Sequence, residues 1–451
     1  MTTMIVIGGG PTGITAALEA ANCGARVTLV SSEPVGGRAN WHSLVPSKVL
    51  LTAADHLGEA AHNPALGLAG GPPEPHLPSL RDRIADQARA WHRHHVSLLE
   101  SRGVGIVSAT ARFLDAHRVE LSREGADAET MSFDKAVIAT GSLPIFLPDI
   151  KPDGKRVLAP RLAGKLAEWP AHMIVVGGGV TGAEFAYFFN RMGADVTWVT
   201  DLPQILPRVD PDLSDVLEQA LSARGITVMK SAPVALVRPQ AEGVSVTLKD
   251  GRSLAGSHAF LAIGRRADLT DLALDAAGVE VTPKGIATDA FGRTSQAHIY
   301  AAGDVTGPPF VANRGQSQAR VAARHASGAE TAGFRPGTVV EAVYTAPQVA
   351  VVGLGESEAT ATGRPVKVFR AAVGEALKPR LSGATAGFVK ILCDGEDGRV
   401  LGGGACCERA AEVLAPIAVA IVGEMTIETL AAVFPAYPTL SELPGIALRG
   451  Y

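Results

Sequence analysis

The same glycine pattern occurs twice in this sequence, at residues 8–13 and 177–182, and this repeat constrains the fold more than any other feature. Each copy follows a short apolar segment and is followed by a helix-like stretch and a second apolar segment. These apolar segments are Met4–Ile7 and Arg26–Val30 in the first copy, and Met173–Val176 and Asp195–Val199 in the second. A strand, a glycine turn, a helix and a second strand make a βαβ unit, which needs a parallel sheet covered by helices.

Each glycine of the pattern has its own task. Gly8 permits a tight turn, Gly10 lets a pyrophosphate approach the backbone, and Gly13 lets the helix pack close to the strand. The corresponding positions of the second copy are Gly177, Gly179 and Gly182. The helix N-terminus offers unpaired N–H groups and a positive dipole end to the phosphates. We therefore predict an α/β chain with two Rossmann-like nucleotide-binding domains.

The acidic residue that usually ends the second strand and binds the ribose is missing from both copies. Ser31-Ser32-Glu33 follows the first strand pair, and Thr200-Asp201 follows the second. Glu33 and Asp201 are close enough along the chain to substitute for it. Between Val199 and Pro207 there is no Lys or Arg for a 2′-phosphate, which favours NAD(H) at the second site and leaves NADP(H) open.

Composition narrows the class of protein. The 451 residues are 47% hydrophobic and 19% charged, as in a well-buried globular chain of roughly three domains. The formal net charge of -4 gives no electrostatic argument for a nucleic-acid partner. The sequence shows no apolar run of membrane-spanning length, and Met4–Ile7 predicts a strand rather than a signal peptide. We expect a cytoplasmic protein without a membrane span.

The region from about residue 338 onward lacks the glycine pattern and is predicted to be an α+β domain. Its expected strands are Glu341–Thr345, Val349–Val352, Gly387–Cys393 and Val400–Cys407, and its expected helices are Glu412–Val422 and Ile427–Ala432. The four cysteines show no paired spacing, and no metal site is predicted.

Four further segments stand between and after the glycine patterns: Ala139-Thr140-Gly141-Ser142, Ala262-Ile263-Gly264-Arg265-Arg266, Ala302-Gly303-Asp304-Val305 and Tyr344-Thr345-Ala346-Pro347. Their order resembles that in the flavoprotein disulfide reductases, the class I pyridine nucleotide-disulfide oxidoreductases that include dihydrolipoamide dehydrogenase and mercuric reductase. The resemblance implies FAD on the first pattern, a nicotinamide nucleotide on the second, and a homodimer built through the third domain. It also implies an FAD-binding domain of residues 1–149 and 271–336, an NAD(P)-binding domain of residues 150–270, and a dimerisation domain of residues 337–451.

The resemblance carries a set of cofactor-binding residues onto this chain. Those expected at FAD are Gly8, Gly10, Pro11, Thr12, Gly13, Glu33, Gly37, Arg38, Lys48, Thr140, Gly141, Gly303 and Asp304. Those expected at the nicotinamide nucleotide are Gly177, Gly179, Gly182, Glu184, Asp201 and Gly264.

The active-site loop departs from the family. Members with a dithiol read Gly-Gly-Thr-Cys, four further residues, then Cys-x-Pro-Ser-Lys. Here the spacing from Gly36-Gly37 to Pro46-Ser47-Lys48 is kept, but Ala39 and Leu44 stand at the two cysteine positions. Neither side chain can form a thiolate, so disulfide exchange is excluded at this loop.

The C-terminal motif changes with the loop. The family's His-Pro-Thr-x-x-Glu, whose His exchanges protons with the dithiol, reads Tyr437-Pro438-Thr439-Leu440-Ser441-Glu442 here. A His titrates near neutral pH, whereas Tyr has a pKa of ~10, so the acid–base function has gone with the thiols. The Tyr-Pro-Thr ending and the segment Glu408–Glu412 resemble the soluble, FAD-dependent pyridine-nucleotide transhydrogenases, although the basic residue expected to recognise NADP is absent.

The hydride-accepting side keeps its family residues. Lys48 and Glu184 hold the positions of a Lys–Glu pair beside flavin N5, where a buried cation favours reduced flavin and the carboxylate offsets its burial. With Tyr437 and Glu442, they form the predicted catalytic set. Trp41 and His42, together with Ala39, Leu44 and Tyr437, either line a pocket for a flat acceptor or fill the volume of the lost dithiol.

Two functions follow from these motifs. In the first, NAD(P)H reduces FAD, and electrons pass directly to a small molecule such as a quinone or a second nicotinamide nucleotide; the reverse direction would oxidise a reduced donor. In the second, the chain is a non-catalytic flavoprotein that binds nucleotide for sensing or scaffolding. The matching hydride-side residues favour the enzyme.

Overall fold

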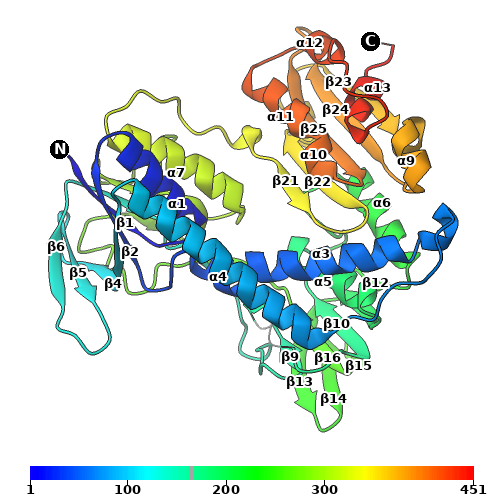
Figure 1. The fold of residues 1–451 in the computed structure, drawn as a ribbon, viewed down its shortest axis with the longest axis horizontal. Coiled ribbons are helices and arrows are strands. Elements are labelled where there is room, and N and C mark those ends of the chain that lie inside the picture. Colours follow the sequence, from blue (N-terminus) through cyan, green and yellow to red (C-terminus); the bar gives the residue numbers. More distant parts are fainter. Residues whose placement is uncertain (162–165, 451) are drawn as a thin grey trace. The chain divides into compact units, whose positions relative to one another are not determined.

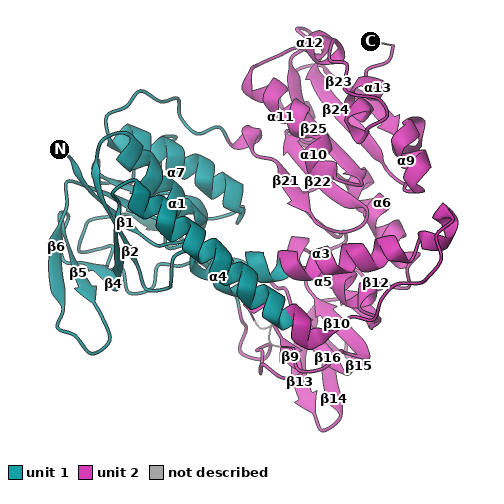
Figure 2. Ribbon diagram, in the orientation of Figure 1, with its two compact units in different colours: residues 1–47, 81–145, 264–335 teal, residues 48–80, 146–263, 336–451 magenta. Residues whose placement is uncertain are grey.

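The computed structural model describes residues 1–161 and 166–450. The chain divides into two compact units (Figure 2). The first unit comprises residues 1–47, 81–145 and 264–335, and the second comprises residues 48–80, the described part of 146–263, and the chain from 336 onward. Two of the boundaries fall inside helices, α3 (Leu44–Ala60) and α4 (Leu77–Ser101).

The first unit is built on a five-stranded parallel sheet in the order β20-β7-β1-β2-β3. Figure 1 labels β1 and β2 of this sheet together with the helices α1 and α7. Its strands are β1 (Thr3–Ile7), β2 (Arg26–Ser31), β3 (Gly105–Ser108), β7 (Lys135–Ile138) and β20 (Ile299–Ala301). Met4 and Val6 belong to one core cluster with α1 (Pro11–Asn22) and α7 (Ala312–Ala326). Ile5 and Ile7 belong to another, with the antiparallel strands β4 (Thr110–Phe113) and β5 (Arg118–Ser122). Residues Met4–Ile7 of the strand are all apolar because both faces of the strand are covered.

The second unit repeats this arrangement. Its parallel sheet has the order β12-β11-β10-β16-β9, and α5 (Val180–Arg191) connects β10 to β11. The strands are β9 (Val157–Leu158), β10 (His172–Val176), β11 (Asp195–Val199), β12 (Thr227–Met229) and β16 (His258–Leu261). Helix α6 (Pro211–Ser222) lies between β11 and β12 in the chain. Both predicted βαβ units are therefore confirmed.

The C-terminal part of the second unit is an antiparallel sheet in the order β21-β22-β25-β24-β23 with short helices packed on it. The strands are β21 (Glu341–Val343), β22 (Gln348–Gly353), β23 (Val366–Ala372), β24 (Phe388–Asp394) and β25 (Val400–Cys407). This confirms the predicted α+β arrangement.

Details of the C-terminal part differ from the prediction. Strand β23 was missed because most of its residues are at least partly exposed, so its apolar pattern is weak. The helix expected over Glu412–Val422 is two helices, α10 (Ala410–Val413) and α11 (Ala415–Val422). A proline stands in the first turn of α11, where its missing N–H is tolerated at a helix start but not in a helix interior.

The 25-residue helix α4 carries charged and histidine side chains along much of its length. Throughout residues 1–161 and 166–450, no helix combines the length and apolar character needed to cross a membrane.

Candidate functional site

The first glycine pattern forms a tight turn between β1 and α1. Gly8 has a φ of 112°, and a Cβ there would lie 2.3 Å from the carbonyl oxygen of Ala139. A Cβ on Gly13 would lie 1.8 Å from the oxygen of Gly8, so the helix packs directly on the turn. Gly10 differs because a Cβ there would meet nothing within 4 Å. Gly10 is also the N-cap of α1, whose first turn begins with Pro11 and has no side-chain cap.

The second pattern has the same geometry. A Cβ on Gly177 would lie 2.2 Å from the oxygen of Ala262, and one on Gly182 would lie 1.9 Å from the oxygen of Gly177. Gly179 is the uncapped N-cap of α5, and the space at its Cβ position is open. Each helix therefore has open space beside its N-cap glycine, and we call these two spaces the glycine cradles. A pyrophosphate held by the backbone N–H groups of the first helical turn would fit there.

At the ends of β2 and β11, a serine and a threonine stand where the acidic residue that binds the ribose is usual. Ser31 packs against Gly9, and Thr200 packs against Gly178, where an added Cβ would lie 2.7 and 2.3 Å from the respective hydroxyl oxygens. The proposed substitutes lie further along. Glu33 is half-buried with its Oε2 3.5 Å from Nε2 of His42, and Asp201 is exposed.

Several predicted FAD residues of the first unit meet in hydrogen-bond networks. Arg38 donates to the carbonyl oxygen of Thr140 at 2.7 Å and also pairs with Asp268. The Thr140 hydroxyl donates to the backbone carbonyl oxygen of Asp268 at 2.7 Å. Asp268 was not among the predicted residues, because the motif nearest to it in the chain, Ala262–Arg266, ends two positions before it.

A second network holds Asp304. The hydroxyl of Ser142 donates to the Asp304 carboxylate, while Arg265 donates to the hydroxyl and carbonyl oxygens of Ser142 at 2.8 and 2.9 Å. Gly141 and Gly264 both have positive φ and lie next to these residues in the chain. Gly303, with a φ of 79°, packs against Thr12, so Thr12 lies beside the third FAD motif.

The segment with the vacated cysteine positions contains a short helix, α2 (Gly37–His42), and not only a loop. A Cβ on Gly37 would lie 2.9 Å from the Cα of Gly10, so the segment lies close against the first glycine turn. The Trp41 indole donates to the oxygen of Pro34 at 3.3 Å, and its ring centroid is 5.5 Å from that of His92. Ala39 belongs to α2, and the partly exposed Leu44 begins α3.

Lys48 and Glu184 form an ion pair within the second unit. The Lys48 ammonium donates to both carboxylate oxygens at 2.8 and 2.9 Å, with side-chain exposures of 35% for Lys48 and 6% for Glu184. Lys48 lies one turn after Leu44 on α3, and Glu184 lies on α5, just beyond the second glycine pattern. The backbone N–H of Tyr344 also donates to Glu184, at 3.2 Å.

The two C-terminal residues of the predicted site are not brought to Lys48 by any described contact. Tyr437 is 70% exposed. Glu442 accepts a hydrogen bond from the N–H of Thr439 at 3.0 Å and thereby caps its own 3₁₀ turn, Leu440–Glu442. Their catalytic role stays a prediction.

All four cysteines are free. Cys393 lies in β24, and Cys406 and Cys407 lie in β25, all buried. Burial raises the pKa of the Cys406 and Cys407 thiols to about 12, so they remain protonated at neutral pH.

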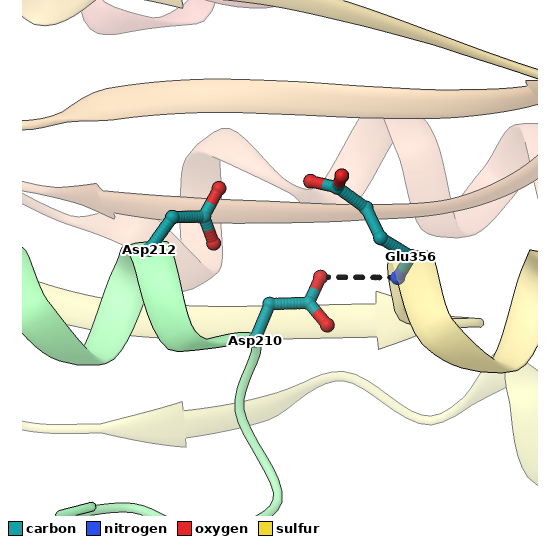
Figure 3. Close-up of side chains that lie close together, drawn as sticks. All are labelled: Asp210, Asp212 and Glu356. Atoms are coloured by element: carbon teal, nitrogen blue, oxygen red, sulfur yellow. Dashed lines mark hydrogen bonds between the residues drawn. The ribbon is translucent and has the colours of Figure 1, made fainter.

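Asp210, Asp212 and Glu356 bring three carboxylates within 4.8 Å of one another (Figure 3). The ammonium of Lys390, which is 1% exposed, donates to all three at 2.7–2.8 Å, and Arg370 pairs with Asp212 and Glu356. The cluster is therefore an ion network that joins the start of α6 to α8 (Glu356–Ala361) and β24.

Two βαβ units with glycine turns and an antiparallel C-terminal sheet form the fold of a two-nucleotide α/β protein. The chain belongs to the pyridine nucleotide-disulphide oxidoreductase family: the model of that name matches residues 2–326, and the model of the family's dimerisation domain matches residues 339–447. The precise boundary between the two nucleotide-binding domains stays a prediction.

Similar proteins cover nearly the full length. The NAD(P)H dehydrogenase (quinone) of Mycobacterium tuberculosis is 33% identical over 98% of this chain and 92% of the relative. Dihydrolipoyl dehydrogenase 2 of Haloarcula marismortui is 31% identical over 98% and 94%. The crystal structure of LpdA from M. tuberculosis matches 100% of this chain and 99% of its own at 33% identity, with a TM-score of 0.95. The chain is therefore a flavoprotein oxidoreductase that uses FAD and NAD(P)H.

Proposed function

We propose that this protein takes hydride from NAD(P)H onto FAD and passes electrons directly to a small conjugated acceptor, without a dithiol relay. A quinone or a second pyridine nucleotide fits this acceptor class. The observation that carries the proposal is the Lys48–Glu184 ion pair. Its lysine lies on α3, the helix that begins with Leu44 at one of the two positions where the family dithiol was expected. When bound, FAD supplies the hydride-accepting ring and the onward electron transfer.

The two glycine cradles divide the nucleotides. The open space at Gly10 and the N-terminus of α1 suit the FAD pyrophosphate, and those at Gly179 and α5 suit the NAD(P)H pyrophosphate. Arg38, Thr140 and Asp268 hold the backbone of two FAD segments together, and Ser142 orients the Asp304 carboxylate.

Lys48 supplies a positive charge on the hydride side, and Glu184 lowers the cost of holding that charge in a partly buried place. The outgoing side needs no thiol. Ala39 and Leu44 exchange no electrons, and Trp41 offers a flat apolar surface. The quinone-dehydrogenase relative supports this acceptor class. We also propose a homodimer formed through the matched dimerisation domain.

Anaerobic mixing of the FAD-loaded protein with NADH, and separately with NADPH, tests the incoming half-reaction. We expect at least one nucleotide to bleach the flavin absorbance, and Lys48→Met to slow the bleaching. Lys378→Met, at an exposed position of the C-terminal domain, is the matched control. If neither nucleotide bleaches the flavin while both still bind, the protein is instead a non-catalytic flavoprotein.

A further inference from the structure

Tyr344 touches both members of the Lys48–Glu184 pair, through two different groups. It directly follows β21 in the C-terminal domain. The Lys48 ammonium lies 4.4 Å from the centroid of the Tyr344 ring, within the range of a cation–π contact. The Tyr344 N–H donates to Oε1 of Glu184 at 3.2 Å. The two contacts fix the ammonium and the carboxylate from one residue.

The ion pair alone leaves Lys48 more than one orientation. Its side chain has a flexible four-carbon stem and is 35% exposed, whereas Glu184 is nearly buried. Both Glu184 oxygens already accept hydrogen bonds from Lys48. The negative face of the Tyr344 ring adds a second attraction from a different direction, and so restricts where the ammonium can lie.

The structure around Tyr344 holds its backbone turn in place. Thr345 is buried, and its hydroxyl donates to the oxygen of Pro347 at 2.6 Å. Arg224, in the nucleotide-binding part of the unit, donates to the oxygen of Ala346. The turn that carries Tyr344 is therefore tied both to itself and to the domain that carries Glu184.

The two helices that carry the ion pair are fixed by a second contact. Tyr187, one turn after Glu184 on α5, donates its hydroxyl hydrogen to Asp55 on α3 at 2.7 Å. With α3 and α5 held together in this way, a change at Tyr344 acts on Lys48 and Glu184 locally rather than by separating the helices.

We propose that Tyr344 is a positioning residue for hydride transfer, which holds the Lys48 ammonium in the place and charge environment that the reaction uses. This inference rests on the proposed function of the ion pair. The aromatic face carries the effect, and the hydroxyl is dispensable. Burial raises the pKa of Tyr344, and the carboxylates of Glu184 and Glu412 add to this, so the phenol stays neutral.

The test compares Tyr344→Phe, Tyr344→Leu, Lys48→Met and the Tyr344→Leu/Lys48→Met double variant, each loaded with FAD. Two quantities are measured: the midpoint potential of the bound flavin and the rate of its reduction by NADH. We expect Tyr344→Leu to make the potential more negative and the reduction about tenfold slower, as loss of a partly buried cation–π contact predicts. Tyr344→Phe should retain the potential and the rate within about threefold, because it keeps the ring face.

The double variant separates this inference from the proposed function. If Tyr344 acts through Lys48, Tyr344→Leu adds no further loss in the Lys48→Met background. Additive losses, or a wild-type rate and potential in Tyr344→Leu, would overturn the inference. A wild-type rate in Lys48→Met would instead refute the proposed role of the ion pair. If Tyr344→Leu does not fold, Tyr344→Met replaces it, and equal rates in the Met and Phe variants overturn the inference.

Discussion

Lys48 donates hydrogen bonds to both carboxylate oxygens of Glu184, at 2.8 and 2.9 Å, although 136 positions separate the two residues in the chain. The pair joins α3 to α5, and it needs no thiol for its geometry. The charge arrangement is therefore present in a chain that has Ala39 and Leu44 at the positions where the dithiol of the family was expected.

Gly10→Ala should weaken FAD retention without unfolding the protein. Gly10 has an extended backbone with a φ of -75°, which alanine adopts, and its Cβ would enter open space in the FAD cradle. We expect FAD affinity to fall by roughly tenfold or more, since the pyrophosphate needs close backbone approach there. The bound FAD after gel filtration and the circular dichroism of the apoprotein check both parts.

Gly13→Ala is the matched control for this cradle. Its Cβ would lie 1.8 Å from the oxygen of Gly8, so this variant should lose stability before it loses any specific affinity. If Gly10→Ala kept full FAD content, the assignment of FAD to the first cradle would be wrong.

Gly179→Ala should separate nucleotide binding from flavin binding. The second cradle is open at Gly179, so alanine should fill it, keep FAD bound and raise the NADH dissociation constant by about tenfold. Titration of NADH against the loaded variant measures the effect. An unchanged NADH affinity would argue against this cradle as the nucleotide site.

Thiol alkylation should leave activity intact. Cys406 and Cys407 are buried with pKa values of about 12, and Cys393 is buried with a raised pKa. The fourth cysteine, Cys23, is partly exposed but lies at the C-terminal end of α1, away from the glycine turn. N-ethylmaleimide treatment of the NADH-reduced enzyme should therefore not change its rate of quinone reduction, because only a thiolate is reactive. Inactivation that depends on prior reduction by NADH would indicate a dithiol elsewhere in the chain.

Lys390→Met should strongly destabilise the second unit. The change leaves Arg370, paired with Asp212 and Glu356, as the remaining described cation, while Asp210 keeps the N–H of Glu356 as a partner. Removing one member of a buried ion network costs on the order of 3–5 kcal/mol. Thermal or denaturant unfolding measures this loss. Arg252→Gln, which breaks an exposed pair with Asp250, should leave the unfolding transition unchanged.

The same network predicts how this loss depends on pH. Burial raises the pKa of Asp212, but the hydrogen bond and charge of Lys390 and the charge of Arg370 outweigh it, and the net pKa lies below 3.8. A lowered folded-state pKa gives stability that is present above the unfolded value and is lost as the pH falls through the folded value. The difference between wild type and Lys390→Met should therefore be constant near neutral pH and shrink below pH 3.8. A difference that grew in acid would contradict this assignment.

The sequence was sufficient for the parts of the fold that rest on local pattern. A glycine turn directly after an apolar segment, as at Met4–Ile7 and Met173–Val176, has few alternatives to a βαβ unit. The edge strand β23 was not predicted, because the partial exposure of its residues weakens its apolar pattern. The segment Glu412–Val422 was predicted as one helix, whereas the proline in the first turn of α11 marks the start of a second one.

Contacts between distant segments were beyond the sequence. Tyr344 belongs to one of the family motifs, but its approach to Lys48 depends on how the C-terminal sheet packs within the second unit.

The preference for NAD(H) was predicted from the absence of Lys and Arg between Val199 and Pro207 in the sequence. That prediction did not take account of Lys230, which is distant in the chain. Since Val199 pairs with Met229 in the parallel sheet, Lys230 lies at the same sheet edge as Thr200, and it pairs with Glu218 at 3.0 Å.

We propose that electrons enter at the Lys48–Glu184 side and leave without a dithiol. Anaerobic stopped-flow mixing of the NADH-reduced enzyme with a quinone, and in parallel with oxidised lipoamide, distinguishes this route from disulfide reduction. We expect the quinone to restore the oxidised flavin spectrum rapidly, with one quinone consumed for each NADH, and lipoamide to have no effect. Rapid reoxidation by lipoamide with none by the quinone would contradict this proposal.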